Sequence, residues 1–236
     1  METPVNAPLK EKFRLEIAKL RDMTFKSKLE YLWEYYKIHF IALIIFLFIV
    51  GSLINTLLIN PNPEDALFIS WNAGFAYDEQ LEELSEALKE QIVEDAANET
   101  VTINRIFMND DDPQIVMASL SQLVAMVSAG VIDVFILDAS LIEEYSQSTI
   151  IQPMEGLLAS IESTDPAIYE RIMEEAKYAM YRSEDDSIEE RLMGIRITSS
   201  PLLSDLGFFE QELFFSTSIT AGNLENTTFA LVAFFE

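Results

Sequence analysis

The uncharged run from Phe40 to Ile59 constrains this chain more than any other feature. It contains twenty residues without a charged side chain or a proline. A helix of that length measures about 30 Å, which matches the hydrocarbon thickness of a bilayer. We therefore predict a transmembrane helix over residues 40–59. The alternative, a buried helix of a soluble domain, requires apolar neighbours on every face of the helix.

The flanks of the run support a membrane span. Four aromatic residues precede it, and such rings favour the headgroup layer; they are Tyr31, Trp33, Tyr35 and Tyr36. Asn60-Pro61-Asn62-Pro63 follows it, and proline does not continue a helix. A cleaved signal peptide is not expected, because 39 residues precede the run and no A-x-A motif follows it. An uncleaved signal anchor fits better.

The distribution of basic residues predicts the orientation in the membrane. Eight of the fifteen Lys and Arg residues lie within residues 1–39, and the next one after the run is Lys89. The positive-inside rule places the N-terminus in the cytoplasm and the C-terminus outside the cell. We expect basic juxtamembrane helices over 1–39, with Thr24 capping the second, a linker at 60–65, and an extracytoplasmic domain over 66–236.

The expected outer segment is strongly acidic. The chain has 40 acidic and 15 basic residues, of which six and eight lie before residue 60, so 34 and seven remain and the net charge there is −27. This charge argues against nucleic acid and against an anionic lipid surface as partners of the domain. The chain has no cysteine, which is ordinary for an exported bacterial domain without disulfides.

Alternating strand and helix patterns follow the span and predict an α/β fold. Short apolar strands are expected at 66–71, 101–108 and 131–137, with helices at 78–97 and from Pro113 to Gly130. Asp112 with Pro113 is a typical helix start. Right-handed crossovers between three such strands require a parallel sheet with helices on both faces.

The pattern is looser after residue 137. We expect short helices over 140–145 and 154–161, one long helix over 166–182, and an acidic loop over 183–187. Strands are expected at 192–198 and 212–219, and Asn223 can cap a final helix. Together these elements predict a three-layer domain with a mostly parallel sheet of about five strands.

Residues 130–158, GVIDVFILDASLIEEYSQSTIIQPMEGLL, resemble part of the extracytoplasmic solute-binding proteins of the type 2 periplasmic-binding fold. The matching features are a strand containing Asp133, a helix over 141–145, and the turn Gln152-Pro153-Met154. Met193-Gly194-Ile195 resembles the strand that returns to the first lobe through the hinge. The resemblance implies a domain similar to a single lobe, because too few residues lie between Leu137 and this strand for a second one.

The N-terminal segment carries a second resemblance. TFKSKLEYLWEYYKIHFIALI, residues 24–44, is similar to the start of uncharacterised single-span membrane proteins of Gram-positive bacteria, which share K-x-x-Y-x-W-x-Y-Y-K-x-H before the span. This resemblance implies a bacterial cell membrane protein with one span.

The sequence shows no catalytic set, and we expect a protein that is not an enzyme and carries no cofactor or metal. The single histidine, His39, lies beside the span, and there is no cysteine. Cys-His and Ser-His-Asp mechanisms and histidine-rich zinc sites are therefore excluded. Asp110, Asp111 and Asp112 lack the spacing of a calcium loop and are better read as a helix cap.

The candidate binding site is predicted from position alone. Ligands of parallel α/β sheets bind beyond the carboxyl ends of the strands. Polar or aromatic residues expected at those ends are Trp71, Asn72, Asp110, Asp138, Ser140, Ser199 and Ser200. The alternative is that Trp71 packs into the core while the polar residues cap helices.

Two functions follow from these expectations. The first is a membrane-anchored module without enzymatic activity, whose outer domain binds a protein in the membrane or another envelope component, as a subunit of a membrane complex. The second is a tethered receptor for a small molecule, associated with a transporter or a sensor. A deep aromatic pocket at the strand ends favours the receptor, and a flat surface there favours the interaction module.

The charge asymmetry generates the first testable prediction. Protease added to intact cells, or to protoplasts if a wall intervenes, is expected to digest or release residues 60–236 and to leave an N-terminal tag intact. Immunoblotting for tags at both ends measures this. Loss of the N-terminal tag with protection of the C-terminal tag would reverse the orientation.

Overall fold

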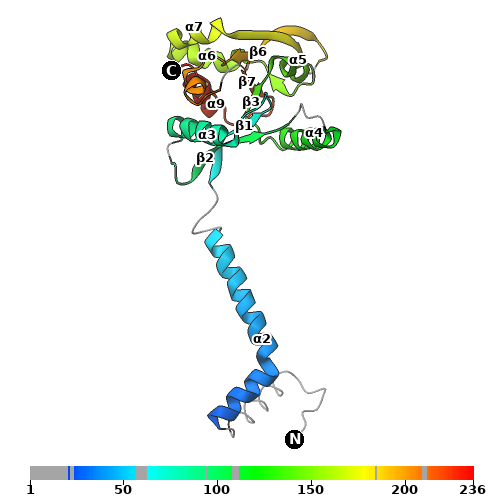
Figure 1. The fold of residues 1–236 in the computed structure, drawn as a ribbon, viewed down its shortest axis with the longest axis vertical. Coiled ribbons are helices and arrows are strands. Elements are labelled where there is room, and N and C mark those ends of the chain that lie inside the picture. Colours follow the sequence, from blue (N-terminus) through cyan, green and yellow to red (C-terminus); the bar gives the residue numbers. More distant parts are fainter. Residues whose placement is uncertain are drawn as a thin grey trace. The chain divides into compact units, whose positions relative to one another are not determined.

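The computed structural model describes residues 21, 24–56, 63–93, 95–107, 112–183, 185–208 and 212–236. The chain divides into two compact units, residues 1–62 and residues 63–236. The first unit contains helix α2, and the second contains every described strand (Figure 1).

Helix α2 (Phe25–Ile54) begins directly after Thr24, as the sequence predicts. The Thr24 side chain makes no capping hydrogen bond to the backbone, and its hydroxyl instead lies 2.9 Å from that of Ser27. Among the described residues, Lys37–Ile54 is the one segment that is long and apolar enough to cross a membrane, and none of it is buried within the protein. The last three residues of the predicted span, 57–59, lie outside the described residues.

Three parallel strands begin the second unit, in agreement with the predicted β-α-β-α-β pattern. β1 (Glu64–Trp71) pairs with β2 (Glu99–Arg105) on one side and with β3 (Val134–Leu137) on the other. The crossover helices α3 (Asp78–Ile92) and α4 (Pro113–Ser128) therefore cover opposite faces of the sheet, as right-handed crossovers require. Figure 1 shows them on opposite sides of β1. Strand β1 begins two residues before the predicted start of the domain at residue 66.

The remaining elements complete a mixed seven-stranded sheet in the order β2-β1-β3-β7-β6-β5, in which β4 also pairs with β7. In chain order they are α5 (Ala139–Gln147), β4 (Ile151–Gln152), α6 (Glu155–Thr164), α7 (Pro166–Glu174), β5 (Ala176–Arg182), β6 (Ile188–Arg196), α8 (Pro201–Asp205), β7 (Phe214–Ser218) and α9 (Leu224–Ala233).

The prediction of a mostly parallel sheet of about five strands is wrong. Only the pairings of β1 with β2 and with β3 are parallel, and the four pairings that involve β4, β5, β6 and β7 are antiparallel. The reason is that β7 inserts between β3 and β6 in the opposite direction. β6 still runs in the same direction as β3, so the two strands end at the same edge of the sheet.

The single helix predicted over 166–182 is also wrong, because its second half is strand β5. Ala179 and Tyr181 are buried, whereas Tyr178 and Met180 are exposed, and this alternation has the period of a strand. β5 forms a hairpin with β6 through the predicted acidic loop. As a strand paired with β6, this segment places Ala179 and Tyr181 on one face, where they pack against Leu141 and Tyr145 of α5.

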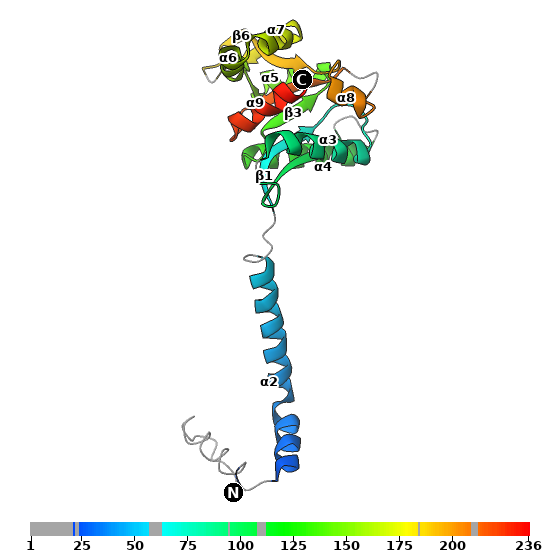
Figure 2. The ribbon, with the colours of Figure 1, turned by 90° about the vertical axis from the view of Figure 1, so that its left-hand side faces the viewer.

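Two hydrophobic clusters lie on either side of the sheet. Leu67, Ile69 and Trp71 of β1 face the cluster formed with α3, α6, α7 and α9, whereas Phe68 faces the cluster formed with α4 and α5. Figure 2 shows α9 between α6 and α3 on the first face. Buried positions on both faces explain why β3 is apolar throughout and why β1 is apolar from Ala66 to Trp71 except at Ser70.

The predicted caps at Asp112 and Asn223 are confirmed, whereas Thr24 makes no capping bond. Asp112 accepts a hydrogen bond from the Gln114 N–H, with Pro113 in the first turn, and Asn223 caps α9. Asp138 caps α5 through the N–H groups of Ser140 and Leu141. Each cap satisfies amide groups that the first turn of a helix leaves without partners.

Asp133 joins three parts of the domain through its buried carboxylate. One oxygen accepts a hydrogen bond from the Phe68 N–H of β1 at 3.0 Å. The other accepts from the N–H groups of Gly222 and Asn223 at 3.0 and 3.2 Å, directly before α9. Side-chain amides of Asn223 and Asn226 then donate to the carbonyl of Ala66. The carboxylate thus fixes the start of α9 against β1 and β3.

We expect Asp133→Asn to destabilise residues 63–236 by about 1.5–3 kcal/mol, the usual worth of hydrogen bonds to a charged group. The asparagine side chain has one acceptor oxygen and one NH₂ donor group. Either the Phe68 N–H or the N–H groups of Gly222 and Asn223 would therefore face a donor in place of an acceptor. Urea unfolding followed by Trp71 fluorescence measures the change, since the other tryptophan, Trp33, lies outside this fragment.

The exposed residue Asp205 provides the matched control. Asp205→Asn removes the same charge and should change the free energy of unfolding by less than about 0.5 kcal/mol. Equal effects of the two variants would show that Asp133 contributes only its charge.

Candidate functional site

A groove runs along β2, which is an edge strand of the sheet. It has a volume of 510 Å³ and lies between β2 and the outer side of α3. Its lining consists of Asp78, Leu81, Glu82, Ser85, Val101, Thr102, Ile103, Asn104, Arg105 and Phe107. Because β2 pairs only with β1 among the described strands, its other side presents backbone groups that no described strand satisfies.

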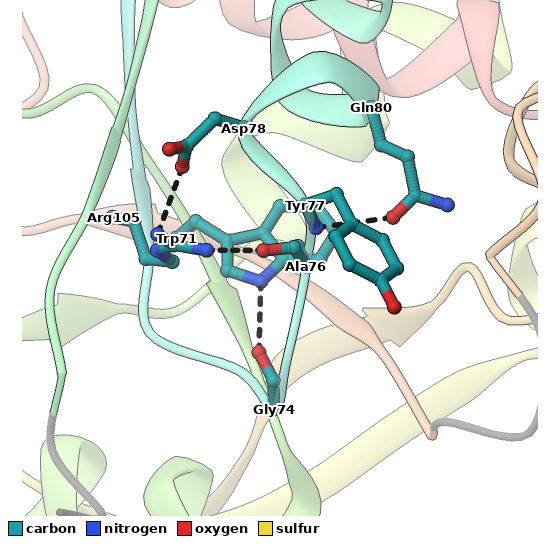
Figure 3. Close-up of polar contacts among 7 residues, drawn as sticks. All are labelled: Trp71, Gly74, Ala76, Tyr77, Asp78, Gln80 and Arg105. Atoms are coloured by element: carbon teal, nitrogen blue, oxygen red, sulfur yellow. Dashed lines mark hydrogen bonds and ion pairs between the residues drawn. The ribbon is translucent and has the colours of Figure 1, made fainter.

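Arg105 closes one end of this groove and holds the loop that follows β1. One terminal nitrogen of its guanidinium donates to the carbonyl of Ala76, and the other lies 2.8 Å from the Asp78 carboxylate (Figure 3). The guanidinium carbon lies 4.6 Å from the centre of the Phe107 ring, a cation–π distance. Its buried Nε–H has no hydrogen-bond acceptor among the described residues.

Further contacts fix the loop over residues 72–77. The Trp71 ring nitrogen donates to the carbonyl of Gly74 at 3.4 Å, and the Tyr77 N–H donates to the Gln80 side chain at 3.1 Å (Figure 3). Gln80 in turn donates to the carbonyls of Leu206 and Gly207. The loop is therefore attached both to α3 and to the segment after α8, which limits its movement.

Three exposed aromatic side chains are here called the aromatic cluster: Phe107, which lies against Arg105, and Phe75 and Tyr77, which flank Ala76, the residue whose carbonyl Arg105 binds. Phe75 and Tyr77 are each 64% exposed, and Phe107 is 45% exposed. The rings of Phe75 and Tyr77 meet edge to face with centres 4.8 Å apart. Exposed aromatic rings beside an arginine are typical of protein-binding surfaces, where Tyr, Phe and Arg are enriched.

The structure places Trp71 and Asn72 inside the domain. Trp71 is fully buried at the end of β1, with its ring 5.0 Å from that of Phe208. Asn72 is also buried, accepts a hydrogen bond from the Ser70 hydroxyl at 2.6 Å and donates to the Tyr145 hydroxyl at 3.1 Å. Burial raises the pKa of Tyr145 far above its usual value, so this hydroxyl stays neutral. Trp71 therefore packs into the core, as the alternative expected, whereas Asn72 is buried among hydrogen-bond partners and is not the N-cap of any described helix.

Asp138 and Ser140 lie at the start of α5, after β3. The Asp138 carboxylate accepts hydrogen bonds from the Ser140 N–H and hydroxyl at 3.0 and 2.5 Å. The two residues thus form a helix cap, which is the second part of the structural alternative. Asp110 lies outside the described residues, so its place in the site stays a prediction.

Ser199 and Ser200 lie after β6, at the same edge of the sheet. They line a cavity of 150 Å³ with Arg171, Glu174, Glu175 and Arg196. The Arg196 guanidinium lies 2.5 Å from the Glu175 carboxylate, and this pairing raises the pKa of Arg196. The buried hydroxyl of Ser200 has no partner among the described residues. Of the predicted site residues, only these two serines share this cavity.

The sequence reasoning did not find the groove beside β2 or the aromatic cluster. The sequence did contain part of the information that points to the aromatic cluster, because two aromatic residues follow Gly74 in a loop directly after a strand. What was missing is that β2 is an edge strand and that Arg105 at its end contacts this loop. Among the described residues, no group of three or more His, Cys, Asp or Glu side chains is arranged to hold a metal ion.

Comparison of the chain with protein families, curated proteins and solved structures finds no match. The functional argument therefore rests on the residues and their geometry.

We expect Arg105→Ala to loosen the loop over 72–77 more than it destabilises the whole domain. The lost bond to the Ala76 carbonyl is worth about 1.5 kcal/mol, as for charged donors in general. The ion pair adds little, since the Asp78 side chain is 88% exposed. Amide hydrogen exchange at Tyr77 and Leu81 should accelerate about tenfold, the factor that corresponds to 1.4 kcal/mol.

Arg182→Ala serves as the control, because Arg182 is exposed and lies 3.8 Å from Asp186 at the β5–β6 turn. It should leave the exchange of Tyr77 and Leu81 unchanged. Unchanged exchange in Arg105→Ala would contradict the assignment of Arg105 as the residue that holds the loop.

Proposed function

We propose that this chain is a single-span membrane protein of a bacterial cell, with its N-terminus in the cytoplasm, whose acidic outer domain binds an extended segment of another protein in the membrane or envelope. It acts without catalysis. The observation that carries the proposal is the groove beside edge strand β2, which ends at Arg105 and the exposed ring of Phe107.

An edge strand beside a groove can bind a peptide by strand addition. The peptide backbone pairs with the free side of the strand, while adjacent pockets select its side chains. Here β2 offers seven residues of edge, and the groove lies along 101–105. The aromatic cluster would pack against an apolar side chain of the bound segment.

The rigid support of the aromatic cluster favours this function. Ordering a loop on binding costs free energy, and a surface that is already held in place avoids that cost. Arg105, Gln80 and the buried Trp71 hold residues 72–77 through the bonds described above. Phe75 and Tyr77 are thus presented to a partner without being free to collapse onto the domain.

A tethered solute receptor is the second candidate, supported by the resemblance of residues 130–158 to one lobe of a solute-binding protein. At the ends of β3 and β6, where a receptor of this kind would bind its ligand, the cavity lined by Ser199 measures 150 Å³ and a second one, lined by Ala139 and Phe214, measures 260 Å³. Ligand pockets usually measure about 300–1,000 Å³ and enclose most of the ligand. The segment between β3 and β6 forms α5–α7, β4 and β5 within the same domain. We therefore favour a domain related to one lobe that binds protein.

Site-specific photo-crosslinking in the full-length chain in its own membrane tests the proposal. A photoreactive phenylalanine at position 77 or 107 should give an adduct of one defined mass. The same residue at Glu90, which is exposed on α3, should give none. Mass spectrometry of the adduct should show one continuous segment of the partner, attached at both positions.

Two outcomes would contradict the proposal. One is equal labelling at positions 77, 107 and 90, which would indicate random collisions. The other is a nutrient-sized solute that binds residues 63–236 with Kd below about 1 μM, equivalent to roughly 8 kcal/mol, because that result would place the receptor first.

A further inference from the structure

Helix α4 exposes apolar side chains on a surface that is otherwise acidic. Residues 113–132 contain no charged residue over twenty positions. Three large side chains on the outer face are exposed: Met117 at 68%, Leu120 at 44% and Val124 at 55%. An adjacent face packs on the domain through Ser119 and Leu123, which are buried. Exposed apolar surface of this kind usually marks an interaction site.

The spacing of these residues indicates that a helix covers them. The spacing from Met117 to Leu120 is three residues and that from Leu120 to Val124 is four. This is the spacing of the residues that form the contact line, or seam, between packed helices. At 100° per residue they fall within an arc of about 60°. Small exposed residues flank them, among them Ala118 and Ser121. A narrow seam with small neighbours permits close approach of a second helix.

The charge pattern argues against the lipid surface as the occupant. A helix that lies on a membrane carries Lys and Arg on its polar face, and α4 has neither. The domain as a whole carries a net charge of −27, from the residue counts given above, and would be repelled by anionic lipids. The seam therefore fits a protein helix better than a bilayer.

We propose that the helix covering this face is α4 of a second copy of the chain, packed antiparallel about a two-fold axis. Two domains of the same large negative charge can approach closely only through an uncharged face, and α4 supplies one. Charged residues beside a seam normally select a different partner helix, and residues 113–132 contain none. A two-fold contact uses the same patch twice, which the self-complementary seam allows.

Attachment to the membrane increases the fraction of chains that pair through α4. A standard interface buries about 800 Å² on each partner, and one face of a four-turn helix offers less. The free domain should therefore associate weakly. Only nine residues separate α2 from β1, which span about 30 Å at most. Two copies in one membrane are thus confined to a thin layer, where the local concentration is high.

The absence of cysteine from the chain allows a direct test. Ser121→Cys in the full-length protein places one thiol near the middle of α4, beside the proposed axis. A bismaleimide that spans the usual helix–helix distance of about 8–10 Å should link two copies in the membrane. Ser163→Cys on α6 is the matched control, because each serine is exposed and donates to a carbonyl in the preceding turn of its own helix. It should give little dimer.

A charged substitution in the seam distinguishes dimerisation through α4 from dimerisation through α2. Adding Val124→Glu to the Ser121→Cys protein should lower the cross-linked fraction about tenfold or more, because like charges would face each other across the axis. Ala159→Glu adds the same charge to an exposed position of α6 and should leave the fraction unchanged. A melting curve of each variant checks that the domain is folded.

Three results would overturn the proposal. The first is equal cross-linking of the thiols at 121 and 163, and the second is a fraction unaffected by Val124→Glu. The third is a thiol at 121 that is protected from a small maleimide in the membrane yet yields no dimer, which would show that a different protein or lipid covers α4. This inference concerns a different surface from the β2 groove and stands independently of it.

Discussion

The buried carboxylate of Asp133 is the contact on which the arrangement of the domain over residues 63–236 depends. It binds backbone N–H groups of β1 and of the turn before α9, two segments about 150 residues apart in the chain. A carboxylate is the side chain best suited to accept several amide hydrogens at once. Because α9 is thereby held against the sheet, its apolar side can cover the cluster that contains Trp71 and Phe215.

A second constraint is the negative charge of the domain. Repulsion between negatively charged surfaces favours solubility and opposes association. Close contact with another macromolecule therefore requires either an uncharged face or a specific polar arrangement. The structure offers one of each kind: the seam of α4, and the groove of β2 with Arg105 at its end. They lie on different elements, so the proposed self-pairing and the proposed binding of a partner segment use separate residues.

The candidate site shows why position in the sequence was an incomplete guide. Trp71, Asn72, Asp138 and Ser140 do follow strands, but burial and helix capping account for each of them. Arg105 had no special signal, because its role depends on the carbonyl of Ala76, about thirty residues earlier. Whether β2 is an edge strand depends on the order of all strands, and no local pattern encodes that order.

The sequence by itself determined the elements that depend on nearby residues. The long apolar helix, the three-strand parallel unit, and the caps at Asp112 and Asn223 all follow from composition, period and hydrogen-bonding capacity over short distances. Only the tertiary structure decided the antiparallel half of the sheet and the conversion of 176–182 from helix to strand. In that segment local propensity is ambiguous, and pairing with β6 satisfies its backbone, so a long-range contact selects the strand.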